Sequence, residues 1–143
     1  MIDRYPITPE FRIISGGQDG ADAAALDWAI AHGIAHGGWC PKGRKSESGP
    51  IDARYRLSET PTASYLQRTE WNVRDSDAAL IFAPDDELDG GSKRTAEIAD
   101  RHGKPWLHFR PDVHPKFIAR FLARHEVRVL NVAGKRASAA PGV

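Results

Sequence analysis

A glycine-bearing loop between an apolar run and a helical pattern is the first segment whose residues could do chemistry. Glycine lets a backbone approach a ligand without a Cβ in the way, and the helix predicted after the loop directs free amide groups and the positive end of its dipole to the same place. The loop therefore predicts an anion site. It lacks the Gly-Lys-Ser/Thr ending of a Walker A loop and does not complete a G-x-G-x-x-G fingerprint, so the alternative is a tight turn that needs glycine for its geometry. The candidate residues are Gly16, Gly17, Gln18, Gly20 and Asp22.

Three cations follow the second predicted strand, at Lys42, Arg44 and Lys45, with Gly43 among them. Lysine recognises phosphate as a point charge, and arginine recognises it through a planar fork of donors. Because this run and the first glycine loop both follow strands of the same predicted sheet, we expect Lys42, Gly43 and Arg44 at the same crevice. The alternative is a solvated surface loop.

One face of a predicted helix carries a phenol, a guanidinium and an amide, at Tyr65, Arg68 and Asn72. Their spacing of three and four residues places them on the same side of the helix, with Thr69 adjacent. Such a face can hold a phosphate and a flat heterocycle, which makes Arg68, Thr69 and Asn72 candidate ligand residues. Arg68 can instead pair on the surface with a carboxylate such as Asp75.

A second glycine-opened helix start lies at Gly90, Gly91 and Ser92, with Thr95 following. Two helix amino termini that meet at one cleft bind an anion better than either does alone. Asn131, at the end of the last predicted strand, adds a side-chain amide that can contact a ring.

The elements that must position these residues alternate between strand and helix along the chain. Short apolar runs predict strands, and apolar residues at helical spacing predict helices. Parallel strands joined by crossover helices give a Rossmann-like α/β fold, a doubly wound, mostly parallel sheet with helices on both faces. The expected strands are residues 11–15, 34–39, 78–82, 106–109 and 127–132.

Helix boundaries follow from caps and breakers. Residues 40–59 form a long polar segment with two prolines, which predicts a functional loop. The first expected helix runs from the first glycine loop to Gly33. The second runs from Pro61 to about Asp75, with Thr60 as its cap, and the third runs towards Gly103, with Ser92 as its cap. The fourth covers residues 115–124.

Length and composition bound the class of protein. A chain of 143 residues fits one domain, residues 1–143, with loose termini at 1–10 and 135–143. The twenty Lys and Arg residues are scattered among nineteen Asp and Glu residues, so the sequence has no cluster of basic residues that would indicate nucleic-acid binding. A single cysteine, Cys40, and the lack of a signal or membrane-spanning pattern predict a cytoplasmic protein. No metal-ligand spacing or acid–base constellation is visible, which favours binding over catalysis.

Five motifs in unbroken order resemble the molybdenum cofactor carrier family. The resemblance implies a Rossmann-like fold related to the lysine-decarboxylase-like and DNA-processing-A-like nucleotide-binding superfamily, assembled as a homo-oligomer. It also implies binding of the molybdenum cofactor, a pterin with a terminal phosphate and a dithiolene that holds the metal. The motifs are residues 15–18 with Gly20 and Asp22, 36–44, 68–77, 90–92 and 130–134.

The second glycine loop departs from the family pattern, because Lys93 and Arg94 stand between Ser92 and Thr95, where small residues are typical. Related phosphoribohydrolases carry the motif Pro-Gly-Gly-x-Gly-Thr-x-x-Glu. This chain lacks the glycine that precedes the threonine of that motif, and it lacks a glutamate at the motif's spacing. Two alternatives to a carrier stay open. One is an enzyme that cleaves a nucleoside monophosphate at its glycosidic bond, with Glu70 or Glu97 as the acidic group. The other is a sensor of a nucleotide-derived signal that acts through a partner.

Overall fold

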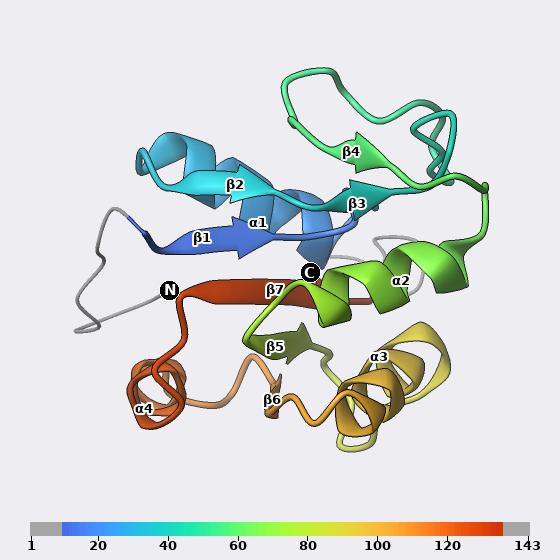
Figure 1. The fold of residues 1–143 in the computed structure, drawn as a ribbon. Helices are drawn as coiled ribbons and strands as arrows, with labels where there is room; N and C mark the ends of the chain where they lie inside the picture. Colours follow the sequence, from blue (N-terminus) through green and yellow to red (C-terminus); the bar gives the residue numbers. More distant parts are fainter. Residues whose placement is uncertain (1–9, 136–143) are drawn as a thin grey trace.

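A five-stranded parallel sheet forms the centre of the protein (Figure 1). The computed structural model describes residues 10–135. The strands of this sheet are β1 (Arg12–Ile14), β2 (Ala35–Gly37), β5 (Ala78–Phe82), β6 (Trp106–Phe109) and β7 (Val129–Gly134). Their order is β2-β1-β7-β5-β6, so the last strand of the chain lies between β1 and β5. The predicted Rossmann-like α/β fold is confirmed.

Helices cover both faces of this sheet. They are α1 (Ala21–Ala31), α2 (Tyr65–Arg74), α3 (Gly90–Arg101) and α4 (Lys116–Arg124). Ala29 of α1 and Leu122 of α4 share one core with the sheet, whereas Val73 of α2 packs with Ile98 of α3 in a separate cluster. Figure 1 shows α1 behind the sheet and α2 in front of it. Among residues 10–135, no helix combines the length and the apolar character needed to cross a membrane.

The sequence of β5 explains why short apolar runs become strands here. Leu80 belongs to the core shared with α1 and α4, and the next residue, Ile81, points to the opposite face. Both side chains are fully buried. A parallel strand covered on both faces needs an unbroken apolar run, and β5 consists of Ala, Ala, Leu, Ile and Phe.

The predicted strand over residues 34–39 is wrong in its extent, because it is divided between two sheets. β2 belongs to the main sheet, whereas β3 (Trp39–Cys40) pairs with β4 (Ser58–Glu59), which lies inside the predicted loop 40–59. Gly38 separates them with a φ of +123°, which favours glycine. A Cβ at Gly38 would collide with the carbonyl oxygen of Ser15. The chain leaves the main sheet at this glycine.

Helix α2 begins later than the sequence predicts. Thr60 is not its cap, because the helix begins only at Tyr65 and the Thr60 hydroxyl contacts the carbonyl oxygens of Cys40 and Thr62, at 3.3 and 2.8 Å. The backbone N–H of Thr60 also donates to Cys40, at 2.8 Å, and so continues the strand pairing. Ser64 is the cap instead, since its side chain accepts a hydrogen bond from the N–H of Gln67 at 3.3 Å.

Two further boundaries differ from the predictions, and both differences fall at the same edge of the sheet. α3 begins at Gly90 with Asp89 as its N-cap residue, so Ser92 lies inside the first turn rather than before it. β7 continues to Gly134, because its end pairs with Phe82 on β5. Apart from Glu10 and Lys135, the termini predicted to be loose lie outside the described residues.

The loop of residues 41–57 is held together by Arg44. Its guanidinium donates hydrogen bonds to the carbonyl oxygens of Ile51, Asp52 and Tyr55, at 3.2, 2.8 and 2.8 Å. The Tyr55 hydroxyl donates to a carboxylate oxygen of Asp27 on α1, at 2.6 Å. A residue predicted to bind ligand therefore shapes this loop, which packs over α1.

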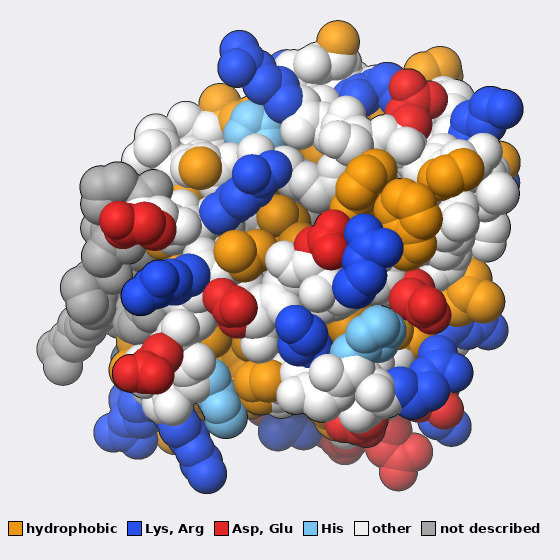
Figure 2. All heavy atoms as spheres, viewed as in Figure 1, with side chains coloured by type: hydrophobic (Ala, Val, Ile, Leu, Met, Phe, Trp, Pro, Cys, Tyr) orange, Lys and Arg blue, Asp and Glu red, His pale blue; other side chains and the backbone are white. Residues whose placement is uncertain are grey.

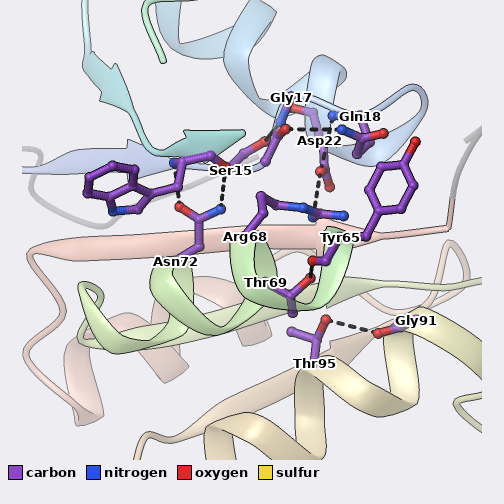
Figure 3. Close-up of polar contacts among 12 residues, drawn as sticks. Ser15, Gly17, Gln18, Asp22, Tyr65, Arg68, Thr69, Asn72, Gly91 and Thr95 are labelled. Carbon is purple, nitrogen blue, oxygen red and sulfur yellow. Dashed lines mark hydrogen bonds and ion pairs between the residues drawn. The ribbon is translucent and has the colours of Figure 1, made fainter. Parts of the chain in front are cut away.

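Asn72 ties the small β3–β4 sheet to α2. Its Oδ1 accepts a hydrogen bond from the N–H of Trp39 at 2.8 Å, and its Nδ2 donates to the carbonyl oxygen of Trp39 at 2.9 Å, the pair drawn in Figure 3. The residue is only 2% exposed. Its amide thus takes the place of a neighbouring strand and satisfies both backbone groups of Trp39.

We expect Asn72→Ala to lower the free energy of unfolding by about 2–4 kcal/mol, because it removes both hydrogen bonds to Trp39 and leaves their backbone groups unsatisfied. Urea denaturation followed by tryptophan fluorescence measures the change. The control is Glu70→Ala, at an exposed position of the same helix, where we expect a change within about 0.5 kcal/mol. Equal stability of the two variants would show that Asn72 does not hold the small sheet.

Candidate functional site

A cavity of about 410 Å³ opens at the carboxyl ends of β1, β5 and β7, between α2 and α3. This volume lies within the range of small-molecule sites in proteins. The carboxyl edge is also where ligands bind in open parallel sheets. Figure 3 shows the side chains that meet there, from the first glycine loop above, from α2 in the middle and from α3 below.

The amino terminus of α3 lies in the wall of this cavity. Gly90, Gly91 and Ser92 form the first turn and line the cavity. The N-cap residue, Asp89, makes no capping hydrogen bond. Its carboxylate instead lies 2.9 Å from Nζ of Lys135. The first amides of α3 and the positive end of its dipole therefore face the cavity without a side-chain cap.

The amino terminus of α1 is used within the fold. The N–H of Ala21 donates to the carbonyl oxygen of Lys135 at 3.5 Å, and that of Ala23 donates to Gln18 at 3.0 Å. Asp22 accepts a hydrogen bond from the N–H of Gln18, at 3.3 Å. Both helix starts reach the cavity, but α1 does so through the carboxylate of Asp22, whereas α3 does so through Gly90, Gly91 and Ser92.

The first two glycines of the first loop make room for protein side chains. A Cβ on Gly16 would lie 2.5 Å from Cδ and Nη1 of Arg68. Gly17 has a φ of +73°, and a Cβ there would lie 2.5 Å from Cδ1 of Leu57. Neither glycine lines the cavity. Their small size lets Arg68 and the loop of residues 41–57 pack close to the end of β1.

Cations and carboxylates alternate in the cavity wall. Arg68 lies 3.6 Å from Oδ2 of Asp22, and both side chains are largely buried, at 11% and 5% exposed. Lys135 lies 2.8 Å from Oδ2 of Asp85 in addition to its contact with Asp89. The hydrogen bonds to these two carboxylates raise the pKa of Lys135 above its ordinary value, so it is charged at neutral pH. On the face of the molecule drawn in Figure 2, Lys and Arg are likewise interspersed with Asp and Glu.

Two threonines in the wall bond to their own helices. The hydroxyl of Thr69 donates to the carbonyl oxygen of Tyr65 at 2.9 Å, and that of Thr95 donates to Gly91 at 3.0 Å. Each hydroxyl oxygen keeps acceptor capacity, and each side chain lines the cavity. Both α2 and α3 thus present a hydroxyl to it.

The structure brings half of the sequence-predicted site residues together at this cavity. Those that line it are Gln18, Asp22, Arg68, Thr69, Gly90, Gly91, Ser92 and Thr95.

The other predicted residues lie outside the cavity wall. Lys42 is exposed, and the N–H of Gly43 donates to a carboxylate oxygen of Glu59 at 2.6 Å. Asn131 is buried within β7, with its backbone between β1 and β5. Those that do not line the cavity are Gly16, Gly17, Gly20, Lys42, Gly43, Arg44, Asn72 and Asn131.

Sequence reasoning missed Lys135, because residue 135 was placed in the loose tail. Its side chain is only 15% exposed and lines the cavity. The available signal was its place directly after the last strand, which matches the place of the first glycine loop after β1. Arg94, which stands where the family pattern has a small residue, also lines the cavity. Glu70 and Glu97, the acids of the hydrolase alternative, are exposed and do not line it.

Within residues 10–135, no group of three or more His, Cys, Asp or Glu side chains is arranged to hold a metal ion.

Comparisons with known proteins agree with the fold and the motifs. A model of the circularly permutated YpsA SLOG family matches residues 13–143, a span that includes every residue lining the cavity. A solved structure, of a "Putative molybdenum carrier protein" from Syntrophus aciditrophicus SB, is 45% identical and superposes with a TM-score of 0.90, covering 97% of this chain and 89% of that one. No curated protein matches. The resemblance to the molybdenum carriers is confirmed, and the chain belongs to the circularly permutated YpsA SLOG family.

Proposed function

We propose that this protein is a carrier that binds a phosphate-bearing pterin or nucleotide-like molecule in the cavity, with the molybdenum cofactor as its favoured ligand. The observation that carries the proposal is the amino terminus of α3, which has no side-chain cap and lines the cavity beside Arg94 and Lys135. The name of the solved relative, a molybdenum carrier at 45% identity, supports the choice of ligand.

The phosphate of the ligand binds at the first turn of α3. Backbone N–H groups at a helix start suit an anion, because they donate hydrogen bonds along the direction of the helix dipole. Gly91 leaves the approach open, since nothing lies within 4 Å of where its Cβ would be. Arg94 and Lys135 add positive charge in the same wall. Asp89 holds Lys135 towards this turn through their contact of 2.9 Å.

The heterocycle of the ligand packs against Tyr65. This side chain lines the cavity, and Nζ of Lys45 lies 4.3 Å from the centre of its ring. The guanidinium of Arg68 lies 5.8 Å from the same centre. The Tyr65 ring offers an apolar contact to a pterin or a base, and the two cations add positive charge beside it. In the molybdenum cofactor, the dithiolene of the pterin binds the metal, so the protein needs to hold only the phosphate and the ring.

The purified protein should bind the molybdenum cofactor at micromolar concentration and slow its oxidation, measured as the appearance of fluorescent oxidised pterin. We expect Arg94→Gln to raise the Kd about tenfold through loss of a charge-assisted contact. Arg101→Gln is the matched control, because Arg101 is exposed on the same helix and does not line the cavity. Absence of binding at micromolar concentration would overturn the proposal, and release of free base from nucleoside monophosphates would indicate the hydrolase instead.

Gly91→Ala separates the binding role of this glycine from its role in the fold. The space around Gly91 accepts a methyl group, so we expect the free energy of unfolding to stay the same or rise by up to about 1 kcal/mol, since alanine favours helix. Ligand affinity should nevertheless fall severalfold, because the methyl group obstructs the approach to the first turn of α3. Thermal unfolding and ligand titration on the same sample measure the two effects. Unchanged affinity would place the phosphate elsewhere in the cavity.

A further inference from the structure

The orientation of the Gln18 carboxamide is set by two backbone carbonyl groups. Its Nε2 donates hydrogen bonds to the carbonyl oxygens of Lys45, at 2.9 Å, and Gly16, at 3.4 Å. A carboxamide rotated by half a turn would place Oε1 against these two acceptors, so the network assigns nitrogen to this side. The oxygen therefore lies on the opposite side of the group.

Oε1 of Gln18 is a buried acceptor that lacks a hydrogen-bond donor. Gln18 is 2% exposed, lines the cavity, and its Oε1 has no hydrogen-bond partner among the described residues. Buried side-chain acceptors are nearly always satisfied, since leaving one unpaired costs the full desolvation of that atom. Such an atom in the wall of a small-molecule cavity marks a place for a donor from the ligand.

Gln18 shares its side of the cavity with Asp22, whose carboxylate accepts the Gln18 N–H and lies 3.6 Å from Nη1 of Arg68. The carboxylates of Asp22 and Glu47 line the same cavity. Figure 3 shows Gln18, Asp22 and the ring of Tyr65 together at one side of the site, and Gly91 with Thr95 at the other. Gln18 and the ring of Tyr65 thus lie on one side of the cavity, and the start of α3 lies on the other.

Given the proposed function, on which this step rests, we infer that Gln18 selects ligands whose heterocycle carries an exocyclic amino group. Oε1 accepts a hydrogen bond from that amino group while the phosphate binds at the start of α3. A heterocycle with a carbonyl oxygen at the same position places that oxygen against Oε1. Neither acceptor then has a donor, so this ligand is rejected. The ligand class is an amino-substituted pterin or purine that bears a phosphate.

Two matched ligand pairs test this selection by calorimetric titration of the wild-type protein. One pair is 6-hydroxymethylpterin phosphate and the corresponding lumazine phosphate, which has an oxygen in place of the amino group. The other is guanosine and inosine monophosphate, which differ only in the exocyclic amino group. We expect the amino-bearing member of at least one pair to bind about tenfold more tightly, as the loss of one buried hydrogen bond implies.

Gln18→Met removes the acceptor while keeping a side chain of similar length, and should reduce this preference to within about twofold. The ratio of the two affinities is the readout, because a general loss of stability weakens both members of a pair alike. Arg94→Gln is the control, expected to weaken both members and to leave the ratio unchanged.

The outcomes separate the two proposals. If no pair that binds shows a preference for the amino group, or if the preference survives Gln18→Met, the role of Gln18 is overturned and the carrier function stands. No binding of any of the four ligands by the wild-type protein overturns the phosphate-and-ring site and the selection together. A preference for the amino-bearing ligand that Gln18→Met abolishes supports both.

Discussion

The insertion of β7 between β1 and β5 is the constraint on which the rest of the site depends. Gly134 ends this strand at a point where β5 and α1 both approach, and a Cβ there would collide with the carbonyl oxygen of Phe82 and with Ala21. The next residue, Lys135, donates its N–H to Phe82 at 3.1 Å and accepts the N–H of Ala21. Three segments that are far apart in the sequence are thereby joined at the carboxyl edge of the sheet, and the cavity is formed around that junction.

Charge in the cavity is balanced rather than of one sign. Arg68 and Lys135 have largely buried side chains, and each lies beside a carboxylate that holds it in position. A wall of this kind suits a ligand that has an anion at one end and donors at the other. The start of α3 and the acceptor of Gln18 supply the two complementary ends, which is why the proposed ligand combines a phosphate with an amino-bearing ring.

The glycines of the two loops serve different purposes, although the sequence presents them alike. In the first loop, Gly16 and Gly17 allow the side chains of Arg68 and Leu57 to come close. In the second, Gly90 and Gly91 have open space around them and line the cavity. Both loops lie at the end of a strand and the start of a helix. The residues that pack against each glycine decide its role. A glycine with a side chain against it makes room for that side chain, whereas a glycine with open space beside it leaves the cavity accessible.

The sequence by itself determined the alternation of strands and helices, because short apolar runs such as β5 and apolar residues at helical spacing are local signals. It also predicted that Gln18, Arg68 and the start of α3 meet at the carboxyl edge of the sheet, where all three line the cavity. It did not predict the later start of α2, since Thr60 is taken up by strand pairing, nor the place of Lys135, since the length of β7 depends on its pairing with β5. Which predicted residues reach the cavity was decided by tertiary structure alone. Asn72 and Arg44 have side chains suited to a ligand, but the backbone groups of Trp39 and of the loop at residues 51–55 are their partners, because buried backbone groups must be satisfied wherever the chain brings them.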